Sequence, residues 1–322
     1  MPEKLTTELA SRIYSTLVRC RQFEEKIIEE YHKKEMRCPT HLSIGQEGVA
    51  AGVCAALSKE DMVFSTHRCH SHTVAKGADF KSLMAELYGK STGCSRGKGG
   101  SMHFIQTEVN VMGSSAIVGG TVPLAVGASL AAKMQGKKTV SVAFFGDGAV
   151  EQDTFHESMN FASLMKLPVI FVCENNDMAT CTHLDRRQPY PELYLHGEVY
   201  RIPSVRVDGT NVFEVYEAAK AAVERARRGE GASLIEGVCY RWKEHVGPNT
   251  DYHHGHRTKE ELDEWMAKCP VKLFEEKLVK DNLVKAEVMK QITDEIKKEL
   301  DEAVQYAKDS PLPTAEELYQ DI

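Results

Sequence analysis

The fold can be predicted from Gly146-Asp147-Gly148, which is followed later in the chain by Asn176. An apolar run at residues 139–145 leads into the first motif, and a second run at 167–173 leads toward Asn176. Both runs are short and rich in β-branched or aromatic residues, which predicts two buried strands. Residues 154–165 between them carry apolar side chains at helical spacing. We therefore predict a βαβ unit with parallel strands and a right-handed crossover.

This unit places two polar side chains at one edge of the sheet. Asp147 and Asn176 both follow the carboxyl ends of parallel strands, where open α/β sheets bind ligands. A carboxylate and an amide oxygen suit a hard cation such as Mg²⁺, which commonly takes its other ligands from phosphate oxygens. Gly146 and Gly148 allow the backbone to approach a diphosphate closely, and the following helix offers free N–H groups. The motif predicts a magnesium diphosphate site, although both residue types are also common in plain turns.

The bulk composition is that of an ordinary globular protein. At 322 residues the chain can bury a large core, and a net charge of −7 argues against nucleic acid as the main partner. No run approaches the roughly 20 apolar residues of a membrane span, and the first twenty residues do not resemble a signal peptide. The nine cysteines contain no Cys-x-x-Cys pair, which favours free thiols and a cytoplasmic location.

Strands and helices alternate along most of the chain, which predicts one α/β domain over residues 1–322 with a mainly parallel sheet flanked by helices. We expect a helical N-terminal extension at 1–35 and a helical C-terminal extension at 263–322. Further segments fall between these ends. Helices are predicted at 45–57, 120–135 and 211–228, strands at 205–208 and 234–240, a strand end or loop at 64–72, and a loop at 89–103.

Four blocks of the sequence together resemble a known family. They are the histidine-rich run at 65–72, the Arg96-Gly-Lys-Gly-Gly-Ser-Met-His103 loop, Ile117-Val-Gly-Gly120, and Gly146-Asp147-Gly148 with Glu174-Asn175-Asn176. In this order they resemble the alpha subunits of thiamine-diphosphate-dependent 2-oxo acid and acetoin dehydrogenases, over roughly residues 10–260. The run at 65–72 looks closest to acetoin dehydrogenases, with pyruvate dehydrogenases next. The resemblance implies the thiamine-diphosphate-binding fold, with thiamine diphosphate and Mg²⁺ as cofactors.

The resemblance also implies a role for each matching position. Asp147, Asn176 and the carbonyl of Met178 would hold Mg²⁺, while His70 and His245 would reach the reacting carbon as catalytic residues. The remaining positions would contact the cofactor: His67, Arg68 and Arg241 at the diphosphate, Gly146, Gly148 and Ala149 beside it, and Ala116, Ile117 and Val118 around the aminopyrimidine and ring system. Arginine suits a diphosphate because it forms charge-assisted, often bidentate hydrogen bonds. Histidine suits proton transfer near neutral pH.

The chain departs from this family after the Gly-Asp-Gly motif. Glu151 stands where the family has asparagine, and Asp153 stands where it has glycine. Two added carboxylates near a diphosphate leave the exact reaction open. A carboligase or transketolase-like subunit and a non-catalytic scaffold subunit are therefore retained as alternatives to the dehydrogenase.

Other interpretations of single residues also stay open. The group of His67, Cys69, His70 and His72 has the residue types of a zinc site, although alternate residues of an extended chain point to opposite faces. For Arg241, an ordinary surface position on its strand is the alternative to a cofactor contact.

The resemblance finally implies partners. Enzymes of this cofactor class use a glutamate from a pyrimidine-binding domain, and this sequence contains no second α/β domain to supply it. The family places that glutamate on a beta subunit, so we expect an α₂β₂ heterotetramer with the active site at a subunit interface. A small-molecule carbonyl substrate and a lipoyl-bearing acyltransferase complete the expected partners, with no nucleic acid and no membrane. An apolar stripe on the helix from about 284, together with the helices at 45–57 and 120–135, is expected to supply interface.

Overall fold

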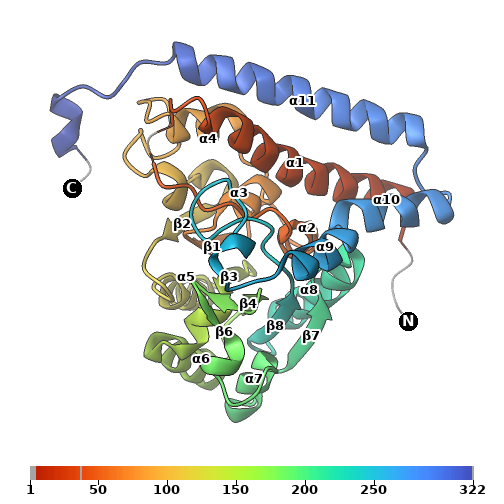
Figure 1. The fold of residues 1–322 in the computed structure, drawn as a ribbon. Coiled ribbons are helices and arrows are strands. Elements are labelled where there is room, and N and C mark those ends of the chain that lie inside the picture. Colours follow the sequence, from red (N-terminus) through yellow and green to blue (C-terminus); the bar gives the residue numbers. More distant parts are fainter. Residues whose placement is uncertain (1–4, 37, 321–322) are drawn as a thin grey trace.

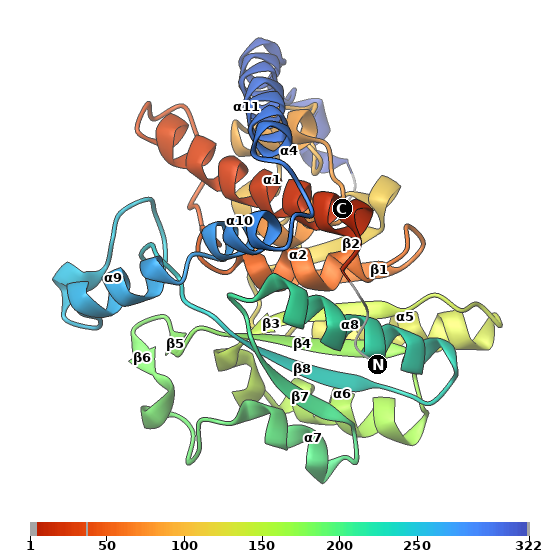
Figure 2. The same cartoon turned by 90° about the vertical axis from the view of Figure 1, so that its right-hand side faces the viewer.

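The computed structural model describes residues 5–36 and 38–320. Its described residues form a six-stranded sheet in the order β2-β1-β3-β4-β8-β7 (Figures 1 and 2). All neighbouring strands of this sheet run parallel. The strands are β1 Met62–Thr66, β2 Val111–Ser115, β3 Ser141–Gly146, β4 Val169–Asn175, β7 Ser204–Asp208 and β8 Ser233–Val238. A small antiparallel hairpin, β5 Met178–Ala179 with β6 Thr182–His183, follows β4.

The βαβ unit predicted from Gly146-Asp147-Gly148 is confirmed. Strand β3 leads into a 3₁₀ turn at Asp147–Glu151, then helix α6 Asp153–Leu164, then strand β4. The two strands are parallel neighbours, with Gly146 opposite Glu174 in the register. Because both strands end at the same edge, the residues after them lie close together.

Helices cover both faces of the sheet. Phe144 packs with α2 Glu47–Ala55 and α8 Val212–Arg227 on one face, whereas its neighbour Phe145 packs with α5 Val122–Met134 and α6 on the other (Figure 2). This alternation is the two-residue period of a strand that is buried on both sides. The small residues of α2 permit its close packing, since a Cβ on Gly52 would meet the side chain of Val215 at 2.7 Å.

A third layer of helices lies outside α2. Helix α1 Thr7–Tyr31 and the long helix α11 Ala286–Asp309 run alongside each other, and α11 also packs on α4 Phe80–Leu87 (Figure 1). Ile296 and Leu300 of the predicted apolar stripe are buried in this layer. The remaining helices of the described chain are α3 His70–Ala75, α7 His196–Val199, α9 Lys259–Ala267 and α10 Pro270–Lys280.

The two predicted helical extensions are therefore helical, and α11 packs within the chain itself. Residues 1–4 of the predicted N-terminal extension and residues 321–322 of the C-terminal one lie outside the described residues. Most of α2 is also buried within the chain. Of the three segments expected to supply interface, α5 keeps the largest exposed apolar side chains, with Met134 79% and Leu124 58% exposed.

The glycine-rich segment at 89–103 is mostly loop, as predicted, with a short 3₁₀ turn at Gly100–Met102. The buried carboxylate of Glu86 holds it. One oxygen accepts the backbone N–H groups of Ser95 and Gly97, and the other accepts those of Gly99 and Gly100. This loop brings Ser101 and Met102 toward the carboxyl edge of the sheet.

Two chemical expectations are also met in the described part of the chain. All nine cysteines lie within it as free thiols. None of the described helices combines the length and apolar character needed to cross a bilayer.

Candidate active site

A cavity of about 390 Å³ opens at the carboxyl edge of the sheet, between the ends of β1, β3 and β4. Most of the residues predicted for the site line it. These are His67, Arg68, Ala116, Val118, Gly146, Asp147, Gly148, Ala149, Asn176, Met178 and His245. His70, Ile117 and Arg241 are not among its lining residues.

Oxygen donors line part of the cavity. Asp147 is 1% exposed, and Asn176 and Met178 are also buried. The turn that carries the latter two is built locally, because the Asn175 side chain accepts the N–H of Asp177, whose φ of 66° reverses the chain. Burial raises the pKa of Asp147, and the positive charge of Arg187 opposes this shift.

Arg68 brings positive charge to the lining of the same cavity. Arg68 is buried, and its guanidinium donates to the carbonyls of Leu42 and His245. Burial, followed by the nearby charge of Arg241, lowers the pKa of Arg68 to about 9. Both of these hydrogen bonds go to neutral carbonyls, so this part of the cavity favours an anionic ligand.

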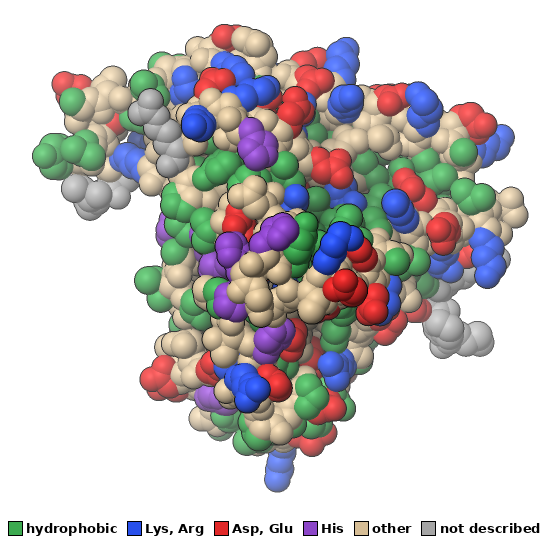
Figure 3. All heavy atoms as spheres, in the orientation of Figure 1, with side chains coloured by type: hydrophobic (Ala, Val, Ile, Leu, Met, Phe, Trp, Pro, Cys, Tyr) green, Lys and Arg blue, Asp and Glu red, His purple; other side chains and the backbone are tan. Residues whose placement is uncertain are grey.

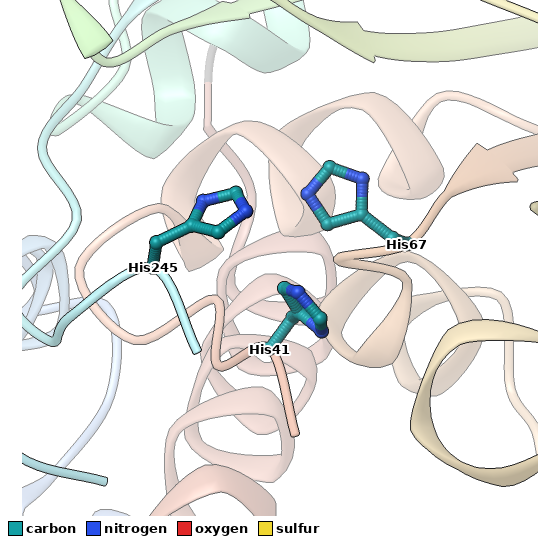
Figure 4. Close-up of side chains that lie close together, drawn as sticks. All are labelled: His41, His67 and His245. Atoms are coloured by element: carbon teal, nitrogen blue, oxygen red, sulfur yellow. The ribbon is translucent and has the colours of Figure 1, made fainter. Parts of the chain in front are cut away.

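Three histidine rings lie close to Arg68. His41, His67 and His245 turn toward one another, with ring centroids 4.8–5.5 Å apart (Figure 4). Histidine side chains gather down the centre of one face of the molecule (Figure 3). Burial and then the charge of Arg68 lower the pKa values of His41, His67 and His245 to about 2, about 3 and about 4 respectively. The three imidazoles are therefore neutral near pH 7.

Nitrogen atoms of these rings lie within 4.8 Å of one another, which is a spacing that a metal ion can bridge. The surroundings do not favour a cation there, because Arg68 lowers the pKa of each of the three rings by its positive charge. We interpret the cluster as the wall of an anion-binding cavity.

The structure places His70 behind the cavity wall. Its ring is fully buried, with Nδ1 3.1 Å from Glu24 Oε1 and Nε2 2.9 Å from Ser101 Oγ. Ser101 Oγ in turn accepts the backbone N–H of His41 at 3.2 Å. Among the described interactions, His70 is linked to the cavity through Ser101 and His41. A direct role for His70 at the reacting carbon stays a prediction.

Arg241 is also withdrawn from the cavity. It is 1% exposed, so it is not an ordinary surface residue, and its guanidinium lies 3.1 Å from Asp251 and donates to the carbonyl of Lys243. Its charge nevertheless lowers the pKa of His67 and of His245. Ile117 is 71% exposed, beside the cavity-lining Ala116 and Val118.

The structure separates the residues of the alternative zinc site. His67 faces the cavity, whereas Cys69 Sγ donates to the carbonyl of Ser101. His70 and His72 each have partners of their own, and the His72 ring stacks on Phe144 with Nδ1 2.7 Å from Ser65 Oγ. The four side chains do not converge on one point, so the zinc interpretation is wrong.

Sequence reasoning missed several lining residues, of which His41, Gln46 and Glu174 matter most. The sequence around these three residues gives only weak indications that they belong to a site. Gln46 opens a helix of small residues, where a polar side chain has to find a buried partner. Glu174 is a carboxylate inside an apolar strand, and a buried carboxylate requires hydrogen bonds or a counter-charge. His41 lies in an irregular segment and carried no periodic signal.

A parallel sheet whose carboxyl edge carries a cavity lined both by oxygen-bearing side chains and by a buried arginine defines an α/β protein with a polar ligand cavity. The chain belongs to the dehydrogenase E1 component family, whose family model matches residues 15–316.

Several curated relatives extend this match over nearly the whole chain. The alpha subunit of acetoin:2,6-dichlorophenolindophenol oxidoreductase from Bacillus subtilis is 40% identical, covering 99% of this chain and 94% of the relative. The protein of the same description from Cupriavidus necator is 38% identical, covering 99% and 95%. The chloroplastic pyruvate dehydrogenase E1 component subunit alpha-3 of Oryza sativa is 38% identical, covering 99% and 76%.

Proposed function

We propose that this chain is the alpha subunit of a thiamine-diphosphate-dependent dehydrogenase that cleaves the C–C bond next to the carbonyl of acetoin or of a 2-oxo acid such as pyruvate. The observation that carries the proposal is the chemistry of the cavity lining. Asp147, Asn176 and Met178 supply oxygen atoms, and Arg68 supplies positive charge. The names of the relatives support an acetoin or pyruvate substrate.

The residues present fit the proposed cofactors. One carboxylate, one amide oxygen and one backbone carbonyl form a suitable donor set for Mg²⁺, which completes its shell with phosphate oxygens and water. A Cβ on Gly146 would meet no heavy atom within 4 Å, so space for a diphosphate lies directly against the backbone. Arg68 and His67 would contact the diphosphate, and Arg241 would add long-range positive charge.

Thiamine diphosphate, when bound, supplies the carbanion that attacks the substrate carbonyl. The protein contributes orientation and proton transfer. Neutral His245 and His41 would take up or return a proton at the substrate oxygen, with His245 held in place through its own carbonyl by Arg68. Backbone groups of Ala116 and Val118 would hold the aminopyrimidine, and Ile117 would pack against the ring system.

We further propose an α₂β₂ heterotetramer, acyl transfer to a lipoyl group on an acyltransferase partner, and a cytoplasmic location. The carboxylates that line the described cavity are Asp147, Glu151 and Glu174. Asp147 and Glu151 share Arg187, and Glu174 is linked to Asn176 through Gln46, so each of the three carboxylates has a partner within the chain. This arrangement supports a glutamate supplied by the beta subunit at the aminopyrimidine. Nine free thiols support a reducing compartment.

The test is co-expression with the neighbouring beta-subunit gene, followed by assay of acetoin, pyruvate and longer 2-oxo acids with an artificial electron acceptor. We expect turnover of acetoin or of one 2-oxo acid that requires both Mg²⁺ and thiamine diphosphate. Turnover without thiamine diphosphate, or a complex that binds the cofactor and only joins the intermediate to aldehydes, would overturn the dehydrogenase assignment.

A further inference from the structure

The orientation of the Asn176 side-chain amide is fixed by hydrogen bonds on both of its ends. Its nitrogen donates to Oε1 of Gln46 at 2.9 Å, and its oxygen accepts the backbone N–H of Met178 at 3.2 Å. An amide oxygen has two lone pairs, so one remains for a cation. The two ends of an amide have nearly the same shape, and only such partners decide which end faces a ligand.

The orientation of the Gln46 side-chain amide must also be fixed, and Glu174 fixes it. The Gln46 nitrogen donates to Oε2 of Glu174 at 3.3 Å. An ionised carboxylate only accepts hydrogen bonds, so Glu174 requires the NH₂ end of Gln46 and leaves the Gln46 oxygen for Asn176. The other oxygen of Glu174 lies 3.2 Å from Nε2 of His72.

The three side chains in this series of hydrogen bonds are held rigidly by burial. Glu174, Gln46 and Asn176 are 3%, 1% and 7% exposed. Arg257 adds a further restraint, because its guanidinium donates to the backbone carbonyl of Asn176 at 2.8 Å. Water has little access to replace a lost partner, so the direction of each hydrogen bond determines the direction of the next.

We infer that Gln46 is a positioning residue, and that Glu174 sets the direction of a hydrogen-bond chain through Gln46 that presents the Asn176 oxygen to the cation. The inference rests on the magnesium site of the proposed function. With the chain reversed, Asn176 would turn its NH₂ group toward the cation and lose a ligand atom. Partners one step behind metal ligands commonly change metal affinity by about 10–100-fold when they are altered.

A charge-relocation series tests this inference in the co-purified alpha–beta complex. In Glu174→Gln the new amide can donate, Gln46 can turn, and Asn176 loses its directing partner. We expect magnesium affinity to fall by about tenfold or more. The double variant Gln46→Glu with Glu174→Gln restores the direction, because residue 46 again only accepts from Asn176. We expect its magnesium affinity to return to within about threefold of the parent, because the partner behind the metal ligand is again correctly oriented.

The measurement is calorimetric titration of Mg²⁺ at saturating thiamine diphosphate, with thermal unfolding of each variant alongside. Glu30→Gln is the matched control. Glu30 is 3% exposed on α1 and accepts from the Tyr88 hydroxyl at 2.9 Å, and it has no contact with Gln46 or Asn176 among the described interactions. We expect it to leave magnesium affinity unchanged.

Parent-like affinity in Glu174→Gln, or a double variant that binds no better than Glu174→Gln, would overturn the inference. If Glu174→Gln fails to fold, the double variant is compared with the parent directly, and a tenfold loss there overturns it. A parent complex that binds no magnesium with thiamine diphosphate would instead defeat the proposed function, so the two failures are distinguishable.

Discussion

The guanidinium of Arg187 forms an ion pair with the carboxylate of Asp147, the residue expected to hold the metal, and a second ion pair with Glu151. Its Nε also donates to the carbonyl of Thr182 at 3.1 Å. Glu151 is the unexpected carboxylate of the Gly-Asp-Gly segment, and its partner is therefore within the chain. A cation that binds Asp147 would compete with Arg187 for the charge of this carboxylate, while Glu151 and Thr182 can retain the other groups of the guanidinium.

Removing this competing charge should tighten magnesium binding. We expect Arg187→Gln to bind Mg²⁺ about tenfold more tightly in the alpha–beta complex, since about 1.4 kcal/mol of lost competition corresponds to a factor of ten. Isothermal calorimetry with thiamine diphosphate present measures this. Arg186→Gln is the control, because the Arg186 side chain is 79% exposed and pairs only loosely with Asp185 at 3.9 Å. Weaker binding in Arg187→Gln would show that Arg187 contacts the cofactor instead.

Asp147→Ala should abolish magnesium-dependent cofactor binding without unfolding the chain. It removes the only carboxylate proposed as a ligand, and Arg187 keeps Glu151 as a counter-charge, so no unpaired cation is left buried. Calorimetry for binding and circular dichroism for folding are the two measurements. Asp185→Ala, at a side chain that is 76% exposed, provides a surface control. Unchanged cofactor affinity in Asp147→Ala would remove Asp147 from the site.

His245 and His70 should fail in different ways when replaced by alanine. His245→Ala should bind cofactor and lose about 10²–10⁴-fold in kcat as a lost proton-transfer group, because the backbone carbonyl that Arg68 contacts is retained. His70→Ala should instead lower the free energy of unfolding by about 2–4 kcal/mol, through a cavity and the lost partner of buried Glu24. Normal stability with a large kcat loss in His70→Ala would support the direct catalytic role predicted from sequence.

The three depressed histidine pKa values predict acid sensitivity. His41, His67 and His245 have folded pKa values of about 2, 3 and 4, below the usual 6.5. Between pH 6.5 and 4 the unfolded chain binds protons that the native chain does not. The contribution of these histidines to the free energy of unfolding should be fully present above about pH 6.5, the reference pKa of histidine. It should fall as the pH drops toward 4.

Thermal unfolding of the parent and of His41→Asn between pH 7.5 and 5 tests this origin. The free energy of unfolding of His41→Asn should fall less steeply with decreasing pH than that of the parent. At pH 5 the difference in slope should correspond to about one bound proton. An excess of inorganic diphosphate should flatten the slope of the parent, because an anion near Arg68 offsets the positive charge that lowers these pKa values. Identical slopes for parent and His41→Asn would contradict the assignment.

The sequence predicted the βαβ unit, the parallel sheet and its flanking helices because each has a strong local pattern. Strands β3 and β4 are continuous apolar runs, and α11 carries a regular stripe. The region around 64–72 was harder. The chain there forms β1, then a turn at His67, then the short helix α3 from His70. A run of histidines has neither the two-residue nor the helical period, so its structure was set by tertiary packing.

The same limit applied to the site. The oxygen donors at Asp147 and Asn176 followed from strand ends, and the structure places them in one cavity. The burial of His70 behind Ser101 did not follow, because it depends on Glu24 from α1, which is distant in sequence. The withdrawal of Arg241 depends in the same way on Asp251 from a later loop. Contacts between remote segments leave no local pattern to detect.

The exposed apolar residues Ile117 and Val118 bear on assembly. They are 71% and 47% exposed, Val118 lines the cavity, and an obligate partner would cover such side chains. We therefore expect the purified alpha chain to show no turnover of acetoin or pyruvate, and the complex with the beta subunit to be active. Mixing the separately purified chains should restore activity with a dependence on beta-subunit concentration.

The variant Ile117→Asp should weaken this reconstitution, whereas Leu312→Asp, at a side chain that is 67% exposed in the C-terminal segment, should not. Turnover by the alpha chain alone at the rate of the complex would show that the active site is self-contained and would refute the shared-site proposal.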